Sequence, residues 1–153
     1  MRELDKTQAI IFALGATLMV IGVGVVVFSP QLAVDSRMYV RGGTVCFAAG
    51  AFLFAGMQMF QAVTSRFDGC DSMKALVLRR LRNMMVFADV CFILAALLLV
   101  ENTFKIVFPY VATTIEGCNN YIRYVHNNWV VVLLVAAILE MYSTHRISRE
   151  ISR

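Results

Sequence analysis

Charge is scarce in this chain of 153 residues, and its scarcity indicates the class of protein. Only 16% of the residues are charged and 59% are apolar, whereas soluble domains have about 25% charged and about 45–50% apolar residues. Long stretches contain no charge at all. A soluble core does not need such runs, so the composition argues against a single soluble domain of this length.

The chain also lacks the cysteine pairs that bind metals or form redox centres. Its four cysteines are Cys46, Cys70, Cys91 and Cys118, and no two of them form a CxxC motif. We expect them to scatter over two membrane spans and over both sides of the membrane. This scatter argues against a disulfide framework and against a metal site. We interpret the cysteines as small packing residues.

Catalytic and cofactor motifs are missing as well. The two histidines, His126 and His145, lie at opposite ends of the last apolar run, so they cannot bracket one haem. No HExxH, GxSxG or P-loop motif is present. The sequence therefore predicts no catalytic residue, no cofactor and no metal ion.

Two uncharged runs are long enough to cross a membrane outright. Residues 7–34 form a run of 28 residues, and residues 42–65 form a run of 24. A helix needs roughly 20 apolar residues to cross a bilayer. The first run is too long for the apolar part of a typical signal peptide, and no clean cleavage motif follows it. We expect it to be a mature helix.

Two further runs each contain one acid. Residues 83–100 carry only Asp89 as a charged residue, and residues 127–145 carry only Glu140. An acid at the centre of a span costs about 2.5–3.5 kcal/mol on insertion scales, which the surrounding large apolar side chains offset. The sequence thus predicts four spans. They cover residues 8–28, 43–63, 83–101 and 127–144.

Lysine and arginine are divided unequally between the two sides of these spans. One side carries ten of them, in both tails and in the loop 64–82, and the other side carries four. The ten include Arg79, Arg80, Arg82 and Arg146. Cytoplasmic loops are enriched in these residues, so the sequence predicts both termini in the cytoplasm. The net charge of +4 is then a sign of topology and not of nucleic-acid binding.

These features predict an all-α fold, in which residues 1–153 form one transmembrane domain, an up-down-up-down bundle of four helices. Small residues in spans 1 and 2 allow two helix backbones to approach closely. They are Gly15, Gly22, Gly24, Gly43, Gly50, Ala51, Ala55 and Gly56. Packing of these two spans within one chain is the favoured interpretation, and a homo-oligomer interface is the alternative.

The loops on the two sides differ in length. Between spans 1 and 2 the loop is short, with a turn expected at Pro30. In the inner loop, Met73, Leu76, Val77 and Leu81 share a helix face. This pattern predicts an amphipathic lead-in to span 3 at the lipid surface. Its basic residues are interpreted as topology anchors, with a dedicated lipid-binding role as the alternative.

The outer segment, residues 102–126, is the least typical part of the chain. Pro109 breaks any continuation of span 3. Beyond it, apolar residues recur at helical spacing, which fits either an outward extension of span 4 or an interfacial helix that bends into it. They are Ile115, Cys118, Ile122, Val125 and Trp129. An outer aromatic belt is also expected, comprising Tyr110, Tyr121, Tyr124 and Trp129.

The polar residues inside the spans are expected at one depth. Asp89 lies seven residues after Arg82, about 10 Å along a helix. Glu140 lies six residues before Arg146, about 9 Å by the same rise. Because spans 3 and 4 run in opposite directions, both acids fall in the cytoplasmic third of the membrane. The same layer includes two glutamines of span 2, Gln58 and Gln61.

This polar layer has three interpretations. Acids within spans normally face the bundle interior and find partners there. The favoured interpretation is a structural clamp of hydrogen bonds, toward which Arg82 and Arg146 are able to snorkel. The second is a proton or cation site in which the two acids share one proton. The third is the docking of a partner helix. Because substrate sites in transporters usually lie near the midplane, the off-centre depth weighs against transport.

Several short segments resemble a known kind of protein. They are residues 54–59 at the end of span 2, 79–82 before span 3, and 128–129, 139–147 and 150 in span 4 and its tail. Together they resemble a family of short, uncharacterised four-span bacterial inner-membrane proteins. The resemblance does not extend to most of residues 102–125. It implies a bacterial inner membrane and no known activity.

The leading functional hypothesis is a small, non-enzymatic scaffold, accessory or assembly subunit whose partners are the lipid bilayer and another membrane protein or a second copy. The alternative is a small proton- or cation-coupled transporter or channel that uses Asp89 and Glu140. An enzyme would need residues of the outer segment such as Glu116, Tyr121 or His126, and their spacing suggests no mechanism.

Overall fold

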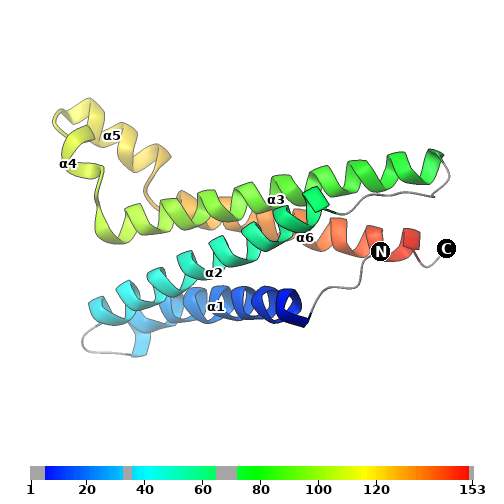
Figure 1. The fold of residues 1–153 in the computed structure, drawn as a ribbon. Helices are drawn as coiled ribbons and strands as arrows, with labels where there is room; N and C mark the ends of the chain where they lie inside the picture. Colours follow the sequence, from blue (N-terminus) through cyan, green and yellow to red (C-terminus); the bar gives the residue numbers. More distant parts are fainter. Residues whose placement is uncertain (1–5, 33–35, 65–71, 152–153) are drawn as a thin grey trace.

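The computed structural model describes residues 6–32, 36–64 and 72–151, and within these ranges it contains helices and no strand (Figure 1). The helices are α1 (Lys6–Leu32), α2 (Ser36–Thr64), α3 (Ser72–Phe104), α4 (Phe108–Val111), α5 (Ile115–Tyr124) and α6 (Asn128–Ile151). Arg2, Arg66, Cys70 and Arg153, on which parts of the sequence analysis depend, lie outside the described residues.

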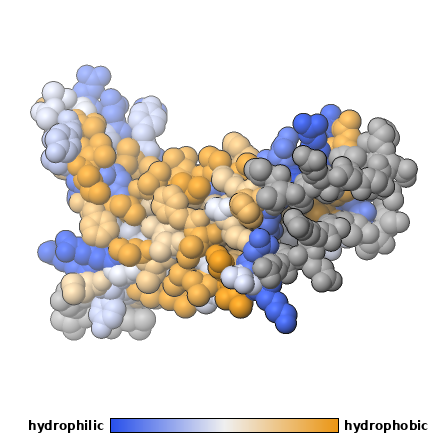
Figure 2. Space-filling view, viewed as in Figure 1, coloured by the Kyte–Doolittle hydropathy of each residue, from blue (hydrophilic) through white to orange (hydrophobic). Residues whose placement is uncertain are grey.

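In the described ranges, four helices are long and apolar enough to cross a membrane, by length and composition. α1, α2 and α3 each contain one of the predicted spans, and α6 covers the fourth from its second residue, because it begins at Asn128. Figure 2 shows the same property on the surface, where an orange apolar band lies between blue ends. Soluble proteins rarely expose apolar patches of this extent. The structure thus supports the class of protein that the composition predicts.

The turn predicted at Pro30 is wrong, because α1 continues through this residue to Leu32. A proline has no backbone N–H, so α1 lacks the hydrogen bond from this position to the carbonyl four residues earlier, and the helix ends two residues later. The connection to α2 lies in residues 33–35, outside the described residues.

The helix predicted before span 3 is confirmed, and its place at a lipid surface stays a prediction. α3 runs without interruption from Ser72 through the span. Leu76 and Val77 are exposed, whereas Leu78 and Leu81 are buried. The periodicity of an isolated segment shows that it is helical, but the helices packed against it decide which side is buried.

α1 and α2 make the closest helix–helix contact. A Cβ atom on Gly22 would lie 2.7 Å from the carbonyl oxygen of Gly43, and one on Gly50 would lie 2.8 Å from that of Gly15. These distances are too short for any side chain, so the two backbones are in direct contact. Because the residue numbers rise on one helix as they fall on the other, the pair is antiparallel. The predicted packing within one chain is confirmed at these positions.

The other small residues of these helices differ in how closely they are packed. Ala51 and Ala55 of α2 are fully buried. A Cβ added at Gly24 or Gly56 would meet nothing within 4 Å in the described part of the chain. Those two glycines therefore take no part in the α1–α2 contact.

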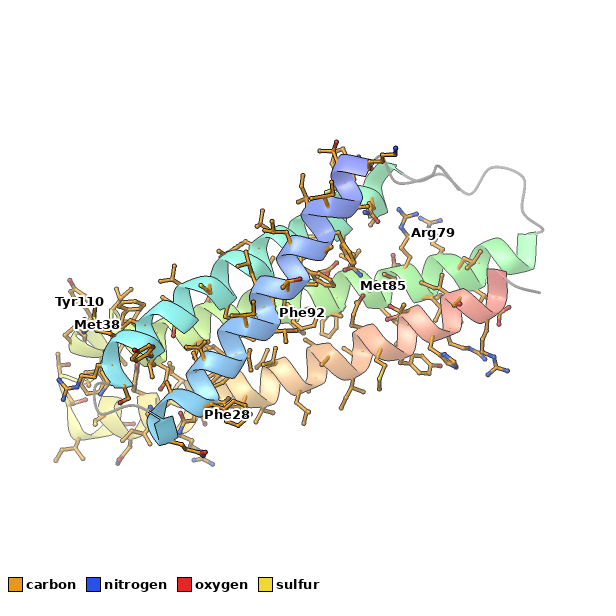
Figure 3. All side chains as sticks on the ribbon, turned by 90° about the horizontal axis from the view of Figure 1, so that it is seen from below. Phe28, Met38, Arg79, Met85, Phe92 and Tyr110 are labelled. Carbon is orange, nitrogen blue, oxygen red and sulfur yellow. The ribbon has the colours of Figure 1, made fainter. Side chains whose placement is uncertain are left out.

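α3 connects this pair to the rest of the molecule. Its contacts with α2 are antiparallel, since Thr103 lies against Thr44 and Arg82 lies against the end of α2. α6 packs along the other side of α3. Among the described residues, the extensive contacts between long helices are those of α1 with α2, α2 with α3 and α3 with α6. Figure 3 shows Phe92 of α3 near the middle of the molecule, and Phe92 meets Phe54 where α2 crosses α3.

An apolar core joins all four long helices near this crossing. Phe92 makes an edge-to-face contact with Phe54, with ring centroids 5.8 Å apart, and Phe54 lies against Phe12 of α1. The buried members of the core are Met19, Phe47, Ala51, Phe92, Ala96, Leu99, Trp129 and Ala136. Asp89 precedes Phe92 by one helical turn, so the polar layer begins directly beside this core.

Candidate functional site

Three helices bring Gln58, Asp89 and Glu140 together at one level of the molecule. Gln58 belongs to α2, Asp89 to α3 and Glu140 to α6. The amide nitrogen of Gln58 donates a hydrogen bond of 2.6 Å to Oε1 of Glu140. The carboxyl groups of Asp89 and Glu140 are close enough to interact electrostatically. We call these three residues the acid layer.

Asp89 is the most unusual residue of the acid layer. Its side chain has no exposed surface, and neither of its carboxylate oxygens accepts a hydrogen bond from the described residues. Buried polar groups in proteins are nearly always hydrogen-bonded, and a buried acceptor without a partner costs about 1–3 kcal/mol. Asp89 therefore lowers the stability of the fold, which is typical of a residue kept for function.

In Glu140 and in Gln58, one polar atom of the side chain forms a hydrogen bond and the other does not, within the described residues. Oε1 of Glu140 accepts from Gln58 and, at 3.4 Å, from the hydroxyl of Thr144. Oε2 of Glu140 and Oε1 of Gln58 are buried and accept no hydrogen bond from the described residues. Together with the two oxygens of Asp89, four buried acceptors converge from three helices. Such a set lacks donors, so its chemistry favours taking up a proton or a cation.

The neighbouring serine does not supply the missing donor. Ser143 lies one turn after Glu140, and its hydroxyl donates to the backbone carbonyl of Leu139 in its own helix. This bond within α6 commits the only hydrogen of the hydroxyl. Ser143 is fully buried, so it extends the polar surface of α6 without neutralising either acid.

Arg82 is directed at the end of α2. Its guanidinium donates to the backbone carbonyls of Gln61, at 2.6 Å, and of Ala62. These carbonyls belong to the last turn of α2, where helix carbonyls have no partner within the helix. A cation is favourable there because it opposes the helix dipole. Arg82 thus joins α3 to α2 one layer away from the acids, and Gln61 takes part through its backbone.

The other predicted basic residues lie on the surface. Arg79, Arg80 and Arg146 are all exposed. Figure 3 shows Arg79 toward the end of the molecule that is opposite to Tyr110. Their position agrees with the anchoring role expected of them, and the acid layer accepts no hydrogen bond from them within the described ranges.

A second polar cluster, which the sequence analysis missed, lies at the opposite end of α3. Its centre is Glu101, whose carboxylate accepts hydrogen bonds from the backbone N–H groups of Val107 and Phe108 at 2.9–3.1 Å. It also accepts one of 2.9 Å from the hydroxyl of Tyr121 in α5. Glu101 therefore fixes both α4 and α5 on the end of α3. We call α4 and α5 the outer cap.

Local backbone geometry also shapes the outer cap. Lys105 has a φ of 51°, a left-handed conformation that bends the chain directly after α3. Thr114 caps α5, because its hydroxyl accepts the N–H of Gly117 at 3.1 Å. Asn127 has a φ of 61° between α5 and α6. An acid seven residues before a short helix with a proline as its second residue is the sequence signal that points to Glu101.

The structure tests the predictions for the outer segment in part. The helical periodicity is confirmed by α5, which is separate from α6. On α5, Ile115 and Ile122 are exposed and Tyr121 is buried, held by its hydrogen bond to Glu101. The aromatic belt stays a prediction, and one of its members, Trp129, is buried in the core. Tyr110 and Tyr124 remain exposed.

The described cysteines, Cys46, Cys91 and Cys118, are free thiols on three different helices. Within the described ranges no three histidine, cysteine, aspartate or glutamate side chains gather in a way that could hold a metal ion. The acid layer itself contributes two carboxyl groups and one amide.

Comparisons with protein-family models, with curated proteins and with solved structures found no match to this chain. The resemblance of its short segments to four-span bacterial membrane proteins stays a prediction.

Proposed function

We propose that this chain is a non-enzymatic protein of the bacterial inner membrane that binds a proton or a small cation in its acid layer and couples this binding to transport or conduction. The observation that carries the proposal is the complete burial of Asp89 with both carboxylate oxygens unbonded. A purely structural clamp would satisfy its polar groups.

The proposed topology is up-down-up-down with both termini in the cytoplasm. Four apolar helices support the number of spans. The antiparallel contacts of α1 with α2, of α2 with α3 and of α3 with α6 support the alternation of direction. The excess of lysine and arginine on the side of both tails supports the orientation.

Binding of one proton changes the acid layer in a defined way. With both carboxyl groups ionised, two negative charges repel each other in a medium that solvates neither of them. A proton held between Asp89 and Glu140 removes one charge and supplies the donor that their oxygens lack. Gln58 keeps Glu140 in place through its amide nitrogen, so the proton is gained or lost at Asp89 and at Oε2 of Glu140.

Within the described residues, the layer has no open path to the surface at its ion-binding atoms. Asp89 is fully buried, and Oε2 of Glu140 is buried as well. The apolar core around Phe92 separates the layer from the outer cap. Exchange of the ion therefore requires a movement of the helices that surround the layer.

The test is proton or sodium flux into vesicles that contain the purified protein. We expect a flux that Asp89→Asn and Glu140→Gln each abolish. The matched control is Glu116→Gln, which changes an exposed acid of α5 in the same way. Absence of flux of either ion in the unchanged protein would overturn the proposal, and so would full flux in both acid-layer variants.

A second candidate function, an accessory or assembly subunit, is favoured by one observation. α6 makes its extensive contacts with α3, and only 11% of its most apolar stretch is buried in the described part of the molecule. A helix of another membrane protein has room to pack there. A gentle-detergent pull-down of the tagged protein tests this, with a stoichiometric partner expected. The test variant is Leu134→Trp on the exposed face of α6, which should reduce the amount of partner that is retained.

A further inference from the structure

α5 is an amphipathic helix whose apolar side is only half used. At 3.6 residues per turn, its apolar residues fall on one side and its polar residues on the other. The apolar side consists of Ile115, Cys118, Tyr121 and Ile122, and the polar side consists of Glu116, Asn119, Asn120 and Arg123. Tyr121 is buried, but Ile115 is 86% exposed and Ile122 is 55% exposed.

The contacts of the outer cap prevent α5 from burying these isoleucines by rotation. Tyr121 is held by its hydrogen bond to Glu101 and by an edge-to-face contact with Phe108, with ring centroids 4.9 Å apart. Glu101 also binds the start of α4, so α5 is fixed relative to α3. The exposure of Ile115 and Ile122 is therefore a stable property of the cap.

The same end of the molecule combines cations with aromatic rings. Arg41 lies 6.0 Å from the ring centroid of Phe104, which joins α2 to α3. Two further pairs involve the outer cap, with Lys105 at 5.5 Å from the ring of Phe108 and Arg123 at 5.6 Å from the ring of Tyr124. Aromatic rings and basic side chains at one level are typical of the region of lipid headgroups.

The exposed apolar surface continues across the outer cap. Tyr110 of α4 is 80% exposed, and Ile106 and Val107 beside it are exposed as well. Figure 2 shows apolar and polar residues intermixed on the cap, next to the apolar band of the long helices. The cap is thus continuous with the surface that a bilayer would cover, which favours lipid as its occupant.

We propose that the outer cap lies on the outer leaflet, with Ile115 and Ile122 inserted at the level where acyl chains meet headgroups and with Arg41, Lys105 and Arg123 near lipid phosphates. This inference rests on the membrane insertion proposed above and is independent of the acid layer. The partner is a phospholipid surface, which an amphipathic helix binds through its buried apolar area and its cations.

The test uses the full chain in vesicles of phosphatidylethanolamine and phosphatidylglycerol. Single cysteines replace Ile122, Asn120 or Leu134 in a background whose native cysteines are alanines, and each carries an environment-sensitive fluorophore. Asn120 is the matched control on the polar side of α5, and Leu134 is an exposed position within α6. Quenchers are aqueous iodide and lipids with a nitroxide near the headgroup or deep in the chain.

We expect the probe at 122 to be blue-shifted and quenched by the shallow nitroxide, whereas the probe at 120 is quenched by iodide. Ile115→Cys repeats the measurement if the variant at 122 fails to give a monodisperse protein. Iodide quenching at both 120 and 122 would overturn the inference. If neither iodide nor either nitroxide lipid quenches the probe at 122, protein covers this surface, and the inference is overturned as well.

The probe at 134 separates this result from the larger proposal. Quenching at 134 by the deep nitroxide, together with an aqueous probe at 122, rejects the position of the cap and leaves membrane insertion standing. An aqueous probe at 134 rejects membrane insertion itself, and the inference about the cap is then overturned with it.

Discussion

At the scale of single residues, the acid layer places stability and function in opposition. Asp89 contributes two buried acceptors that no described residue satisfies, and it stands beside a second carboxyl group. Removing a buried, unpaired charged group is often neutral or stabilising. The residue that we expect to be necessary for flux is therefore expected to weaken the fold.

This opposition gives a prediction for the stability of Asp89→Asn. The amide keeps the shape of the carboxyl, supplies a donor toward Glu140 and removes the repulsion between two acids. We expect the free energy of unfolding to rise by about 1–3 kcal/mol. The measurement is the midpoint of thermal unfolding in detergent. A lower midpoint than that of the unchanged protein would show that Asp89 has a stabilising partner.

Gln58 is expected to behave in the opposite way. Its amide donates the 2.6 Å hydrogen bond to Oε1 of Glu140, so Gln58→Leu leaves that oxygen with only the 3.4 Å hydrogen bond from Thr144. We expect a loss of about 1–3 kcal/mol in the free energy of unfolding. Gln31→Leu, at an exposed position of α1, is the matched control and should leave the unfolding midpoint unchanged.

At the scale of helices, the contact between α1 and α2 depends on glycine at particular positions. A Cβ at Gly22 would meet the backbone of α2, whereas one at Gly24 would meet open space in the part of the chain that the structure describes. We expect Gly22→Ala to destabilise the fold by about 1–3 kcal/mol through overpacking. Gly24→Ala should be neutral or stabilising by up to about 1 kcal/mol. Thermal unfolding of the two variants, compared side by side, checks the difference. Equal midpoints would refute the close contact.

The outer cap gives a prediction for hydrogen exchange. Glu101→Gln replaces a charged acceptor of three groups by an amide with one acceptor oxygen, so the start of α4 loses hydrogen bonds. We expect the amides of Val107 and Phe108 to exchange faster while those of α6 keep their rates. Tyr121→Phe keeps the ring contact with Phe108 and should have a smaller effect. Unchanged exchange at both amides in Glu101→Gln would exclude the proposed anchoring role.

At the scale of the whole molecule, the sequence predicts the long helices well because each depends on a local property. A run of apolar residues is sufficient to identify a span, and two acids at a similar distance from flanking arginines are sufficient to identify a shared layer. Gln58 joins that layer for the same reason. None of these predictions needs a contact to be known in advance.

What the sequence did not predict has the opposite cause. Tyr121 is buried because it meets Glu101, twenty residues away in the chain. Leu78 is buried although it lies outside the apolar face that the sequence pattern indicates. The described hydrogen bonds of Arg82 go to backbone carbonyls of α2. These outcomes are decided by tertiary contacts, which a periodic pattern does not contain.

The contact between α1 and α2 has a consequence for how the protein is made. The glycines of this contact lie within the first 50 residues, so the contact needs no residue of α3 or α6. A ribosome adds about 5–20 residues per second, and contacts between neighbours in the chain form much faster than that. We therefore expect α1 and α2 to pair during synthesis, before α3 and α6, which carry the two acids, have been made.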